Sequence, residues 1–314
     1  EPTRTLDGVD IKLWANAESR NDVTEAHALG AAGVGLYRTE FLFLGSSELP
    51  DEEAQFRAYR DAVLAMTGRT VTIRTLDLGA DKADKTGLAL RDEPNPALGL
   101  RGVRLSLARS GLLRTQLRAI ARASGYGPLR VLVPMVSGGE EVRAVRHALD
   151  DVLRELHAEG RETAAQIPLG AMVEVPSAAL ALPTFVGLCD FLSIGTNDLV
   201  QYLLAADRTN EALDGLYSPL HPAVLRVLRD VVRTGQRRGK PVTVCGEIAA
   251  DPAFVPLLLA LGLTELSLHP ATLLEVRRTI RACDLGRLRA AAPALLRARN
   301  RDGIERWLQA NPAG

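Results

Sequence analysis

The stretch Phe191-Leu192-Ser193-Ile194-Gly195-Thr196-Asn197-Asp198 determines how the rest of the chain can fold. It begins as a short apolar run that stops abruptly at Gly195, and an apolar, helix-like segment starts at Leu199. This pattern is typical of a buried parallel strand that presents polar residues at its carboxyl end. The segment 167–175 has the same form and presents Glu174, so we expect Glu174 and Asp198 to emerge from neighbouring strands.

Apolar runs of this kind recur along the chain and alternate with helix-like segments. The helical segments carry apolar residues at three- and four-residue steps, as Phe56, Tyr59 and Val63 do, which is the spacing of one helix face. We predict strands at 11–15, 33–37, 71–73, 131–135, 167–175, 191–194, 241–244 and 266–268. Eight strand–helix repeats predict a closed parallel (β/α)8 barrel of the TIM type, with right-handed crossovers and extra helices.

The length of 314 residues suits a single barrel with a few additional elements. We predict one domain over residues 1–314, in which residues 1–8 are a linker and residues 284–314 form C-terminal helices. A capping box from Ser137 to Glu140 is expected to start the long helix that runs to about His157. Because the sequence begins with Glu1 rather than Met, we expect the chain to be a fragment of a longer protein.

The composition indicates an ordinary soluble protein. Lys plus Arg and Asp plus Glu balance at 38 each, so no overall field favours nucleic acid or a membrane surface as a partner. No apolar run reaches membrane-spanning length, and no signal peptide is visible. The cysteines Cys189, Cys245 and Cys283 form no CxxC pair, which argues against a zinc site or a disulfide framework and favours the cytoplasm.

Polar residues gather at the predicted carboxyl ends of the strands, where the chemistry of such barrels takes place. They are Asn16, Arg38, Arg74, Glu174, Asn197, Asp198 and Cys245. A single acid at a strand end is more often a helix cap or a surface residue, and Asp198 could cap the helix that follows it. Two acids on adjacent strand ends favour a Mg²⁺ site, because Mg²⁺ takes hard oxygen ligands and keeps positions for water and phosphate.

Several motifs of the chain resemble the phosphoenolpyruvate-utilising enzymes. The match is carried by 33–41, 74–79, Asp81-Lys82, 95–101, 172–178, 193–199 and 245–249, in the order of the family and over nearly the whole chain from about Leu6. The chain most resembles the carboxyl-terminal phosphoenolpyruvate-binding barrel of enzyme I of the bacterial sugar phosphotransferase system. The resemblance implies magnesium-dependent transfer of the phosphoryl group of phosphoenolpyruvate to a histidine, with release of pyruvate.

The candidate residues make chemical sense in those roles. Arg38 and Arg74 are expected to clamp the phosphate, and Arg208 to supply a third cation, because the guanidinium makes paired hydrogen bonds and keeps its charge. Arg101 is expected to orient the substrate or a neighbouring acid, and Asn197 to donate to phosphate or carboxylate. Glu174 and Asp198 would hold the metal. The resemblance implies that Cys245, as a thiol with a near-neutral pKa, returns the proton to carbon.

The acceptor is missing from this chain. None of His27, His147, His157, His221 and His269 lies in a segment like the phosphohistidine motif of the family. The resemblance therefore implies a separate N-terminal phosphohistidine domain and, through it, the small carrier HPr, as well as a homodimer. His269-Pro270 departs from the smaller residues that the family usually carries after the last strand, which leaves the eighth loop open.

Two other interpretations remain open at this stage. Pyruvate phosphate dikinase and phosphoenolpyruvate synthase share the barrel and the Gly195-Thr196-Asn197-Asp198 segment, although 74–82 looks like enzyme I. A dimerisation module that senses phosphoenolpyruvate without chemistry is the second, and a damaged site would support it. Whether the parent is a stand-alone enzyme I, a fused multiphosphoryl transfer protein or a nitrogen-regulatory relay is not readable from the barrel.

Overall fold

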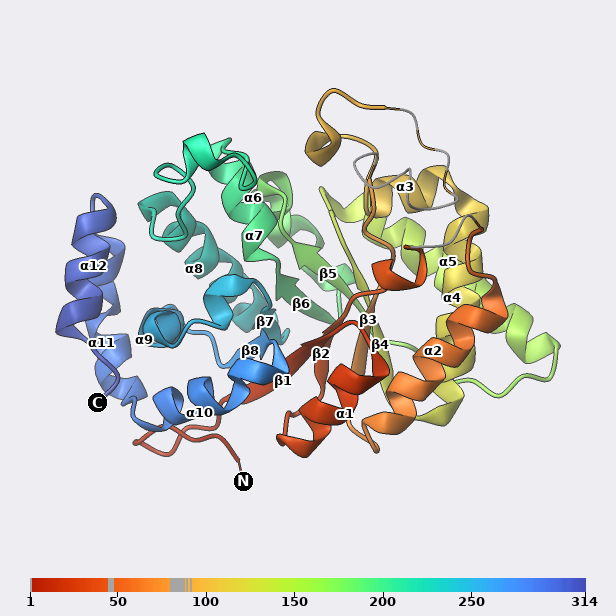
Figure 1. Cartoon of the computed structure of the whole chain (residues 1–314), viewed down its shortest axis with the longest axis horizontal. Coiled ribbons are helices and arrows are strands. Elements are labelled where there is room, and N and C mark those ends of the chain that lie inside the picture. Colours follow the sequence, from red (N-terminus) through yellow and green to blue (C-terminus); the bar gives the residue numbers. More distant parts are fainter. Residues whose placement is uncertain (1, 45–47, 80–87, 89, 91) are drawn as a thin grey trace.

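The computed structural model describes residues 2–44, 48–79, 88, 90 and 92–314. Its centre is a closed barrel in which each strand pairs in parallel with the next one along the chain, and β8 pairs with β1 (Figure 1). The strands are β1 (Lys12–Ala17), β2 (Val34–Tyr37), β3 (Val71–Arg74), β4 (Leu129–Val133), β5 (Leu169–Val173), β6 (Phe191–Ile194), β7 (Val242–Val244) and β8 (Glu265–Leu268). The predicted (β/α)8 barrel is confirmed, with strand ends shifted by a few residues.

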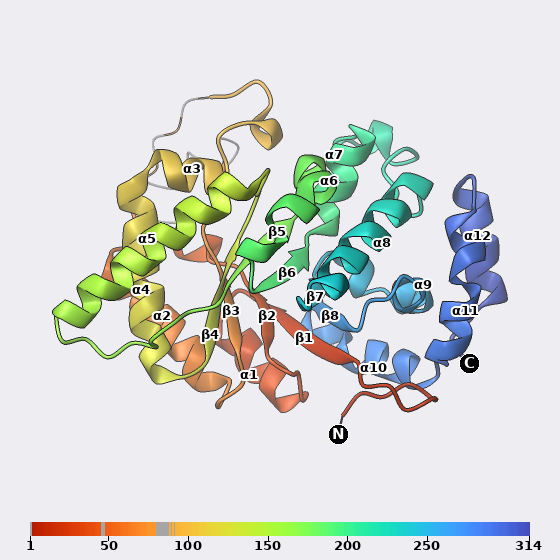
Figure 2. The same cartoon turned by 180° about the vertical axis from the view of Figure 1, so that it is seen from behind.

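Helices surround the barrel (Figures 1 and 2). They are α1 (Arg20–Ala28), α2 (Glu52–Ala65), α3 (Val103–Ala108), α4 (Ser110–Ala123), α5 (Gly139–Ala158), α6 (Pro176–Phe185), α7 (Thr196–Leu204), α8 (Pro222–Arg237), α9 (Val255–Ala260), α10 (Leu273–Arg281), α11 (Leu285–Leu296) and α12 (Arg301–Ala310). The last two confirm helices in the tail, and α11 packs on α9. The barrel end that carries the polar residues is built from the segments that follow the strands.

The strands are apolar because both of their faces are covered. All residues of β2, β5 and β6 are buried, as expected for strands between a packed interior and a layer of helices. The interior contains one unexpected charge at the amino end of the barrel. The Arg130 guanidinium lies over the rings of Trp14 (4.6 Å) and Phe191 (3.9 Å), and burial lowers its pKa to about 10 despite nearby Glu265.

The long helix α5 starts one residue later than the sequence suggested. Its N-cap is Gly138, and the side chain that reaches back is Glu141 rather than Glu140, accepting from the backbone N–H of Gly138 (3.3 Å) and from the Ser137 hydroxyl (3.0 Å). The predicted Ser137–Glu140 capping box is therefore wrong by one position. Two consecutive acids made the register ambiguous, and packing of the apolar face of α5 decided it.

The first residues of the described chain lie against the start of the tail. The backbone N–H of Leu6 donates to the Cys283 carbonyl (2.8 Å), and the Asp7 carboxylate accepts from the backbone N–H groups of Leu285 (2.9 Å) and Gly286 (3.0 Å). Asp7 thus satisfies two donors at the start of α11. Whether residues 1–8 also link the barrel to another domain stays a prediction.

Asp7 is expected to make the stability of the protein depend on pH. The Thr5 hydroxyl and then the Leu285 N–H lower the pKa of Asp7 from 3.8 to about 2. A carboxyl group with a lowered pKa stabilises the fold at pH values above its ordinary pKa. This stabilisation is lost as the pH falls toward 2. Asp7→Asn should therefore lower Tm near neutrality, with a difference from the wild-type protein that narrows toward about pH 3. Thermal denaturation across this range measures it, and a constant difference would contradict it.

No helix within the described part of the chain is both long enough and apolar enough to cross a membrane.

Candidate active site

One cavity of about 530 Å³ opens at the carboxyl ends of the barrel strands. Its wall is formed by the segments after β1, β2, β3, β5, β6 and β7, together with Arg101. All the predicted site residues lie in this wall, namely Arg38, Arg74, Arg101, Glu174, Asn197, Asp198, Arg208 and Cys245. Asn16 does not line the cavity. Its amide donates to the Cys245 carbonyl (3.1 Å) and its oxygen accepts from the Ser267 hydroxyl (2.7 Å), which ties three strand ends together.

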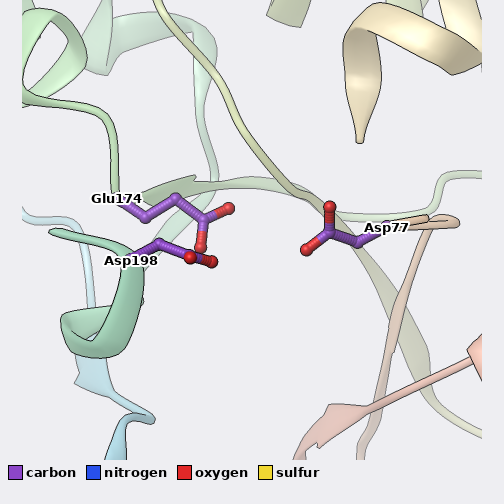
Figure 3. Close-up of side chains that lie close together, drawn as sticks. All are labelled: Asp77, Glu174 and Asp198. Atoms are coloured by element: carbon purple, nitrogen blue, oxygen red, sulfur yellow. The ribbon is translucent and has the colours of Figure 1, made fainter. Parts of the chain in front are cut away.

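Three buried carboxylates converge in this cavity (Figure 3). One oxygen from each of Asp77, Glu174 and Asp198 lies within 4.8 Å of the others. Figure 3 shows Glu174 and Asp198 side by side, with Asp77 facing them from the segment after β3. The Oδ1 atom of Asp198 is buried and has no hydrogen-bond partner among the described residues. Crowded carboxylates with an unsatisfied oxygen fit a bound divalent cation, which supplies the missing positive charge.

Glu174 is fixed by the backbone opposite it. Its Oε1 accepts from the Met135 backbone N–H (2.6 Å), and Met135 has a φ of +58°, which is unusual for a residue with a Cβ. The pKa of Glu174 is raised well above its ordinary value, first by burial and then by the charges of Asp198 and Asp77. The free site therefore disfavours three simultaneous negative charges, and a cation would relieve that repulsion.

Gly195 allows Glu174 to approach the start of α7 closely. A Cβ at this position would lie 2.6 Å from the Glu174 Oε2 atom and 3.2 Å from the Met172 Cγ atom. Glycine is therefore required here by space rather than by its backbone conformation, which has a φ of −87°. The glycine lets the oxygens of Glu174 and Asp198 share one side of the cavity.

Gly195→Ala should destabilise the fold and displace Glu174. Overpacking of this kind costs about 1–3 kcal/mol, and urea denaturation measures the change in the free energy of unfolding. Gly187→Ala is the matched control, because a Cβ at Gly187 meets no atom within 4 Å. Equal stability of the two variants would contradict the close approach.

Arginine side chains surround Asp77. Arg101 makes a fork with the Asp77 carboxylate, with Nη2 at 2.9 Å from Oδ2 and Nε at 3.2 Å from Oδ1, and its Nη2 also reaches Asp198 (3.3 Å). Arg74 pairs with Glu40 (3.1 Å) and with Asp77 (3.4 Å). Burial opposes the charge of Arg74, but Glu40 and Asp77 raise its pKa, so the guanidinium stays protonated. The buried cations are thereby held in place before any ligand arrives.

The cavity mouth carries more exposed polar groups. Arg38 Nη1 pairs with Glu18 (3.0 Å), and both side chains are about one third exposed, at 39% and 34%. Asn197 accepts from the Glu247 backbone N–H through its Oδ1 (3.0 Å), and its amide nitrogen donates to the Glu247 carboxylate (3.4 Å). Arg208 is exposed, and its backbone N–H donates to Gln201 (3.0 Å). Arg38 and Arg208 thus lie at the more exposed part of the cavity wall, where a bound anion could reach them.

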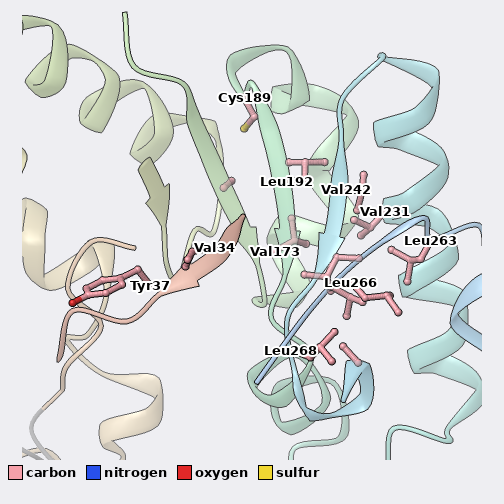
Figure 4. Close-up of a cluster of buried hydrophobic side chains, with 14 of the residues drawn as sticks. Val34, Tyr37, Val173, Cys189, Leu192, Val231, Val242, Leu263, Leu266 and Leu268 are labelled. Atoms are coloured by element: carbon pink, nitrogen blue, oxygen red, sulfur yellow. The ribbon is translucent and has the colours of Figure 1, made fainter. Parts of the chain in front are cut away.

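Cys245 forms part of the cavity wall beside Leu36 and Met172. Its Sγ accepts from the Ser193 hydroxyl (3.3 Å) and donates to the Ile194 carbonyl (3.4 Å). Burial raises the pKa of the thiol above its ordinary value, although Ser193 opposes the shift. The expected near-neutral pKa is thus not found in the ligand-free site, where the thiol keeps its proton. Cys189, by contrast, precedes β6 and belongs to the same apolar cluster as Leu192, separate from that of Cys245 (Figure 4).

Sequence reasoning left several wall residues without a role. Asp77, Glu40, Glu18 and Glu247 all line the cavity. Of these four residues, Asp77 could most easily have been predicted from the sequence, since it follows Arg74 by three residues at the same strand end. Asp81 and Lys82, which contributed to the resemblance, lie outside the described residues. No histidine stands among the described residues that line the cavity. His269 instead caps the turn after β8, with its Nδ1 accepting from the Ala271 N–H (3.2 Å).

Fold and site together define a parallel (β/α)8 barrel with an acidic, arginine-rich site at the carboxyl ends of its strands, a class suited to anionic substrates that bind with a metal. The family model described as "PEP-utilising enzyme, PEP-binding domain" matches residues 1–285, where PEP is phosphoenolpyruvate. The chain belongs to this family of PEP-utilising enzymes, as its PEP-binding domain.

The relatives agree in name. The chain is 48% identical over 299 residues to a phosphoenolpyruvate-protein phosphotransferase from Cupriavidus necator. The aligned region covers 95% of this chain and 51% of that protein. Proteins of the same name from Geobacillus stearothermophilus (46% over 281 residues; 90% of this chain, 48% of that protein) and Listeria monocytogenes (45% over 284 residues; 90% and 50%) are similar. The chain thus spans about half the length of the curated relatives it matches.

A solved structure described as a citrate lyase from Burkholderia xenovorans LB400 resembles the chain in fold. The TM-score is 0.54 at 17% identity, over 96% of this chain and 90% of that one. This likeness supports the barrel architecture alone.

Proposed function

We propose that this chain is the PEP-binding and catalytic domain of a phosphoenolpyruvate-protein phosphotransferase. In this proposal it moves the phosphoryl group of PEP to a histidine on a separate domain and releases pyruvate. The observation that carries the proposal is the convergence of three buried carboxylates with Arg74 and Arg101 in one cavity. The metal ion would pair with the carboxylates of this cavity, and the phosphate would pair with its arginines.

The metal in this proposal is Mg²⁺, held by Glu174 and Asp198. Both acids are buried, and the Oδ1 atom of Asp198 is unsatisfied among the described residues. When bound, Mg²⁺ would neutralise negative charge on the substrate oxygens. Asp77 is assigned a different role, because Arg101 forks onto it and Arg74 lies 3.4 Å away. It holds the two guanidiniums at the side of the cavity opposite Glu174.

The arginines and Asn197 would bind the substrate anion. Arg74 offers a protonated guanidinium at the cavity floor, and its Nε is buried without a partner among the described residues. Arg38 and Arg208 stand at the mouth, where they can close on the phosphate, and Asn197 adds an amide. Arg101 orients Asp77 through its fork and Asp198 through its Nη2 atom. Transfer of a phosphoryl group depends mainly on such positioning and charge neutralisation.

Cys245 would complete the reaction. Transfer breaks the bond between phosphorus and the enol oxygen, the histidine nitrogen takes the phosphoryl group, and the bond electrons remain on an enolate. That enolate becomes pyruvate when its methylene carbon gains a proton. The buried thiol of Cys245 is protonated and lies in the cavity wall, so it can donate this proton and later recover one from water.

The partners follow from the same proposal. The acceptor histidine would come from an N-terminal phosphohistidine domain of the parent protein, and the phosphoryl group would pass on to HPr in carbohydrate uptake in the cytoplasm. A homodimer is part of the proposal by resemblance only. The common name of the relatives supports this function over a dikinase or a synthase, and the complete set of site residues favours catalysis over sensing alone.

Titration calorimetry tests the proposal directly. The chain should bind PEP in the presence of Mg²⁺ and bind it weakly or not at all when a chelator removes the metal. Pyruvate, which lacks the phosphate, provides the comparison and should bind more weakly, because the arginines lose their main partner. Equal binding of PEP with and without Mg²⁺ would contradict the metal assignment.

A further inference from the structure

A chain of buried hydrogen bonds lies behind the loops that carry Arg38 and Arg74. Gln116 on α4 is its centre, Tyr59 and Gln55 on α2 lie on one side, and Thr39 lies on the other. The four side chains are at most 1% exposed. None of them lines the cavity, so a direct contact with a bound substrate is excluded for this set.

In this hydrogen-bond network, each bond can have only one direction, from one defined donor to one defined acceptor. The Leu76 backbone N–H is a donor and lies 2.9 Å from the Gln116 side chain, so the atom facing it must be the oxygen Oε1. The Gln116 Nε2 then donates to the Thr39 hydroxyl (3.2 Å) and to the Tyr59 hydroxyl (3.1 Å). Gln116 therefore uses both of its donor hydrogens and its acceptor.

The remaining links continue from these hydroxyls. Thr39 donates to the Arg74 carbonyl (3.0 Å), and Tyr59 donates to the Gln55 oxygen (3.0 Å), whose amide donates to the Pro50 carbonyl (3.0 Å). Every one of the groups is satisfied, so the network fixes a single arrangement instead of allowing several.

The loop side of the network ends next to the residues of the active site. Thr39 stands between Arg38 and Glu40, the accepting carbonyl belongs to Arg74, and Leu76 precedes Asp77. Glu40 adds a parallel connection, because its Oε1 accepts from the Asp77 N–H (2.9 Å) and pairs with Arg74 (3.1 Å). The segments after β2 and β3 are thus joined through side-chain contacts at the height of the cavity.

We propose that Gln116 is a positioning residue that sets the guanidinium of Arg74 and the carboxylate of Asp77 for PEP binding. This inference rests on the proposed function. A buried amide needs hydrogen-bond partners for all its polar atoms, whereas an apolar side chain of the same shape could fill the space without any. What an apolar side chain lacks is the ability to hold the Leu76 N–H and the Thr39 hydroxyl in fixed relative positions.

Gln116→Met tests the proposal, because it keeps the length of the side chain and removes the amide. We expect PEP affinity at saturating Mg²⁺ to fall about tenfold or more, since small displacements of positioned groups have large effects. Tyr59→Phe is the matched control, because it breaks the link toward α2 and leaves the bonds to Leu76 and Thr39. Its PEP affinity should stay within about twofold of the wild-type value, although both variants lose stability.

A second pair of variants covers failure of Gln116→Met to fold. Thr39→Val removes the hydroxyl that joins Gln116 to Arg74 and should weaken PEP binding, while Thr39→Ser keeps the hydroxyl and should preserve it. Binding of PEP by Thr39→Val at the wild-type affinity, with lowered Tm alone, would overturn the proposal and leave the network a purely stabilising role, and so would the same result for a folded Gln116→Met. Absence of PEP binding by the wild-type chain would instead overturn the proposed function.

Discussion

Glu174→Gln should abolish magnesium-dependent binding of PEP without lowering the stability of the chain. The amide keeps the shape of the side chain and an oxygen for the Met135 N–H, but it removes one of three crowded negative charges. Loss of a residue that hydrogen-bonds to a metal ligand typically lowers metal affinity about 10- to 100-fold. Loss of a ligand itself should therefore weaken magnesium-dependent PEP binding by more than about 100-fold. Calorimetry with PEP and Mg²⁺ measures this effect.

The stability of Glu174→Gln separates a metal ligand from a structural acid. The pKa of Glu174 is raised by burial and by Asp198 and Asp77, so a neutral side chain at this position relieves repulsion in the metal-free protein. We therefore expect an unchanged or higher Tm without Mg²⁺. Glu155→Gln, at an exposed ion pair with Arg114, serves as the control for a lost carboxylate away from the cavity. A variant that unfolds more easily and still binds PEP with Mg²⁺ would overturn the assignment of Glu174.

Cys245→Ala should bind PEP nearly as tightly as the wild-type chain and lose proton transfer at carbon. General acid catalysis typically contributes about 100-fold or more, so the rate should fall by that factor. The chain alone can be assayed in the reverse direction, through exchange of the methyl protons of pyruvate for deuterium in heavy water with Mg²⁺, followed by NMR. Pyruvate formation after addition of a phosphohistidine domain provides the forward measurement.

The other cysteines supply the control for this substitution. Cys189 is as buried as Cys245 but belongs to the outer apolar layer, and burial raises its pKa as well, to about 11 (Figure 4). Cys189→Ala should leave the exchange rate unchanged, because no substrate reaches that thiol. If Cys245→Ala exchanges protons at the wild-type rate, Cys245 is only a packing residue of the barrel interior.

The barrel could be predicted because its strands are buried on both faces. Such strands appear in the sequence as continuous apolar runs, so β2 and β6 were evident and each delivered polar residues at a definite point. Boundaries were less certain where apolar residues continue beyond the sheet. The run 167–175 contains β5 only over Leu169–Val173. Pairing with β4 and β6 determined where that strand ends, and these partners are distant in sequence.

The site was predicted in composition, and its internal arrangement was not. The rule that chemistry gathers at the carboxyl ends of barrel strands brought Arg38, Arg74, Glu174 and Cys245 to one rim without any knowledge of distances. That rule does not distinguish an acid that binds a metal from one that holds an arginine. Asp77 follows a strand end like Glu174, and the fork from Arg101 is what supports the proposal that Asp77 holds arginines instead of the metal.

The order of apolar runs and polar strand ends in the sequence by itself determined the parallel barrel and the set of side chains at its rim. The tertiary structure alone decided which oxygen faces which cation, because hydrogen bonds and ion pairs here join residues from distant parts of the chain. It alone also decided how far burial shifts the pKa of Glu174 and Cys245. Arg130 makes the same point, since nothing in β4 marks it for the barrel interior. Desolvation and charge depend on every neighbour in space, and the sequence specifies those neighbours only once the barrel has closed.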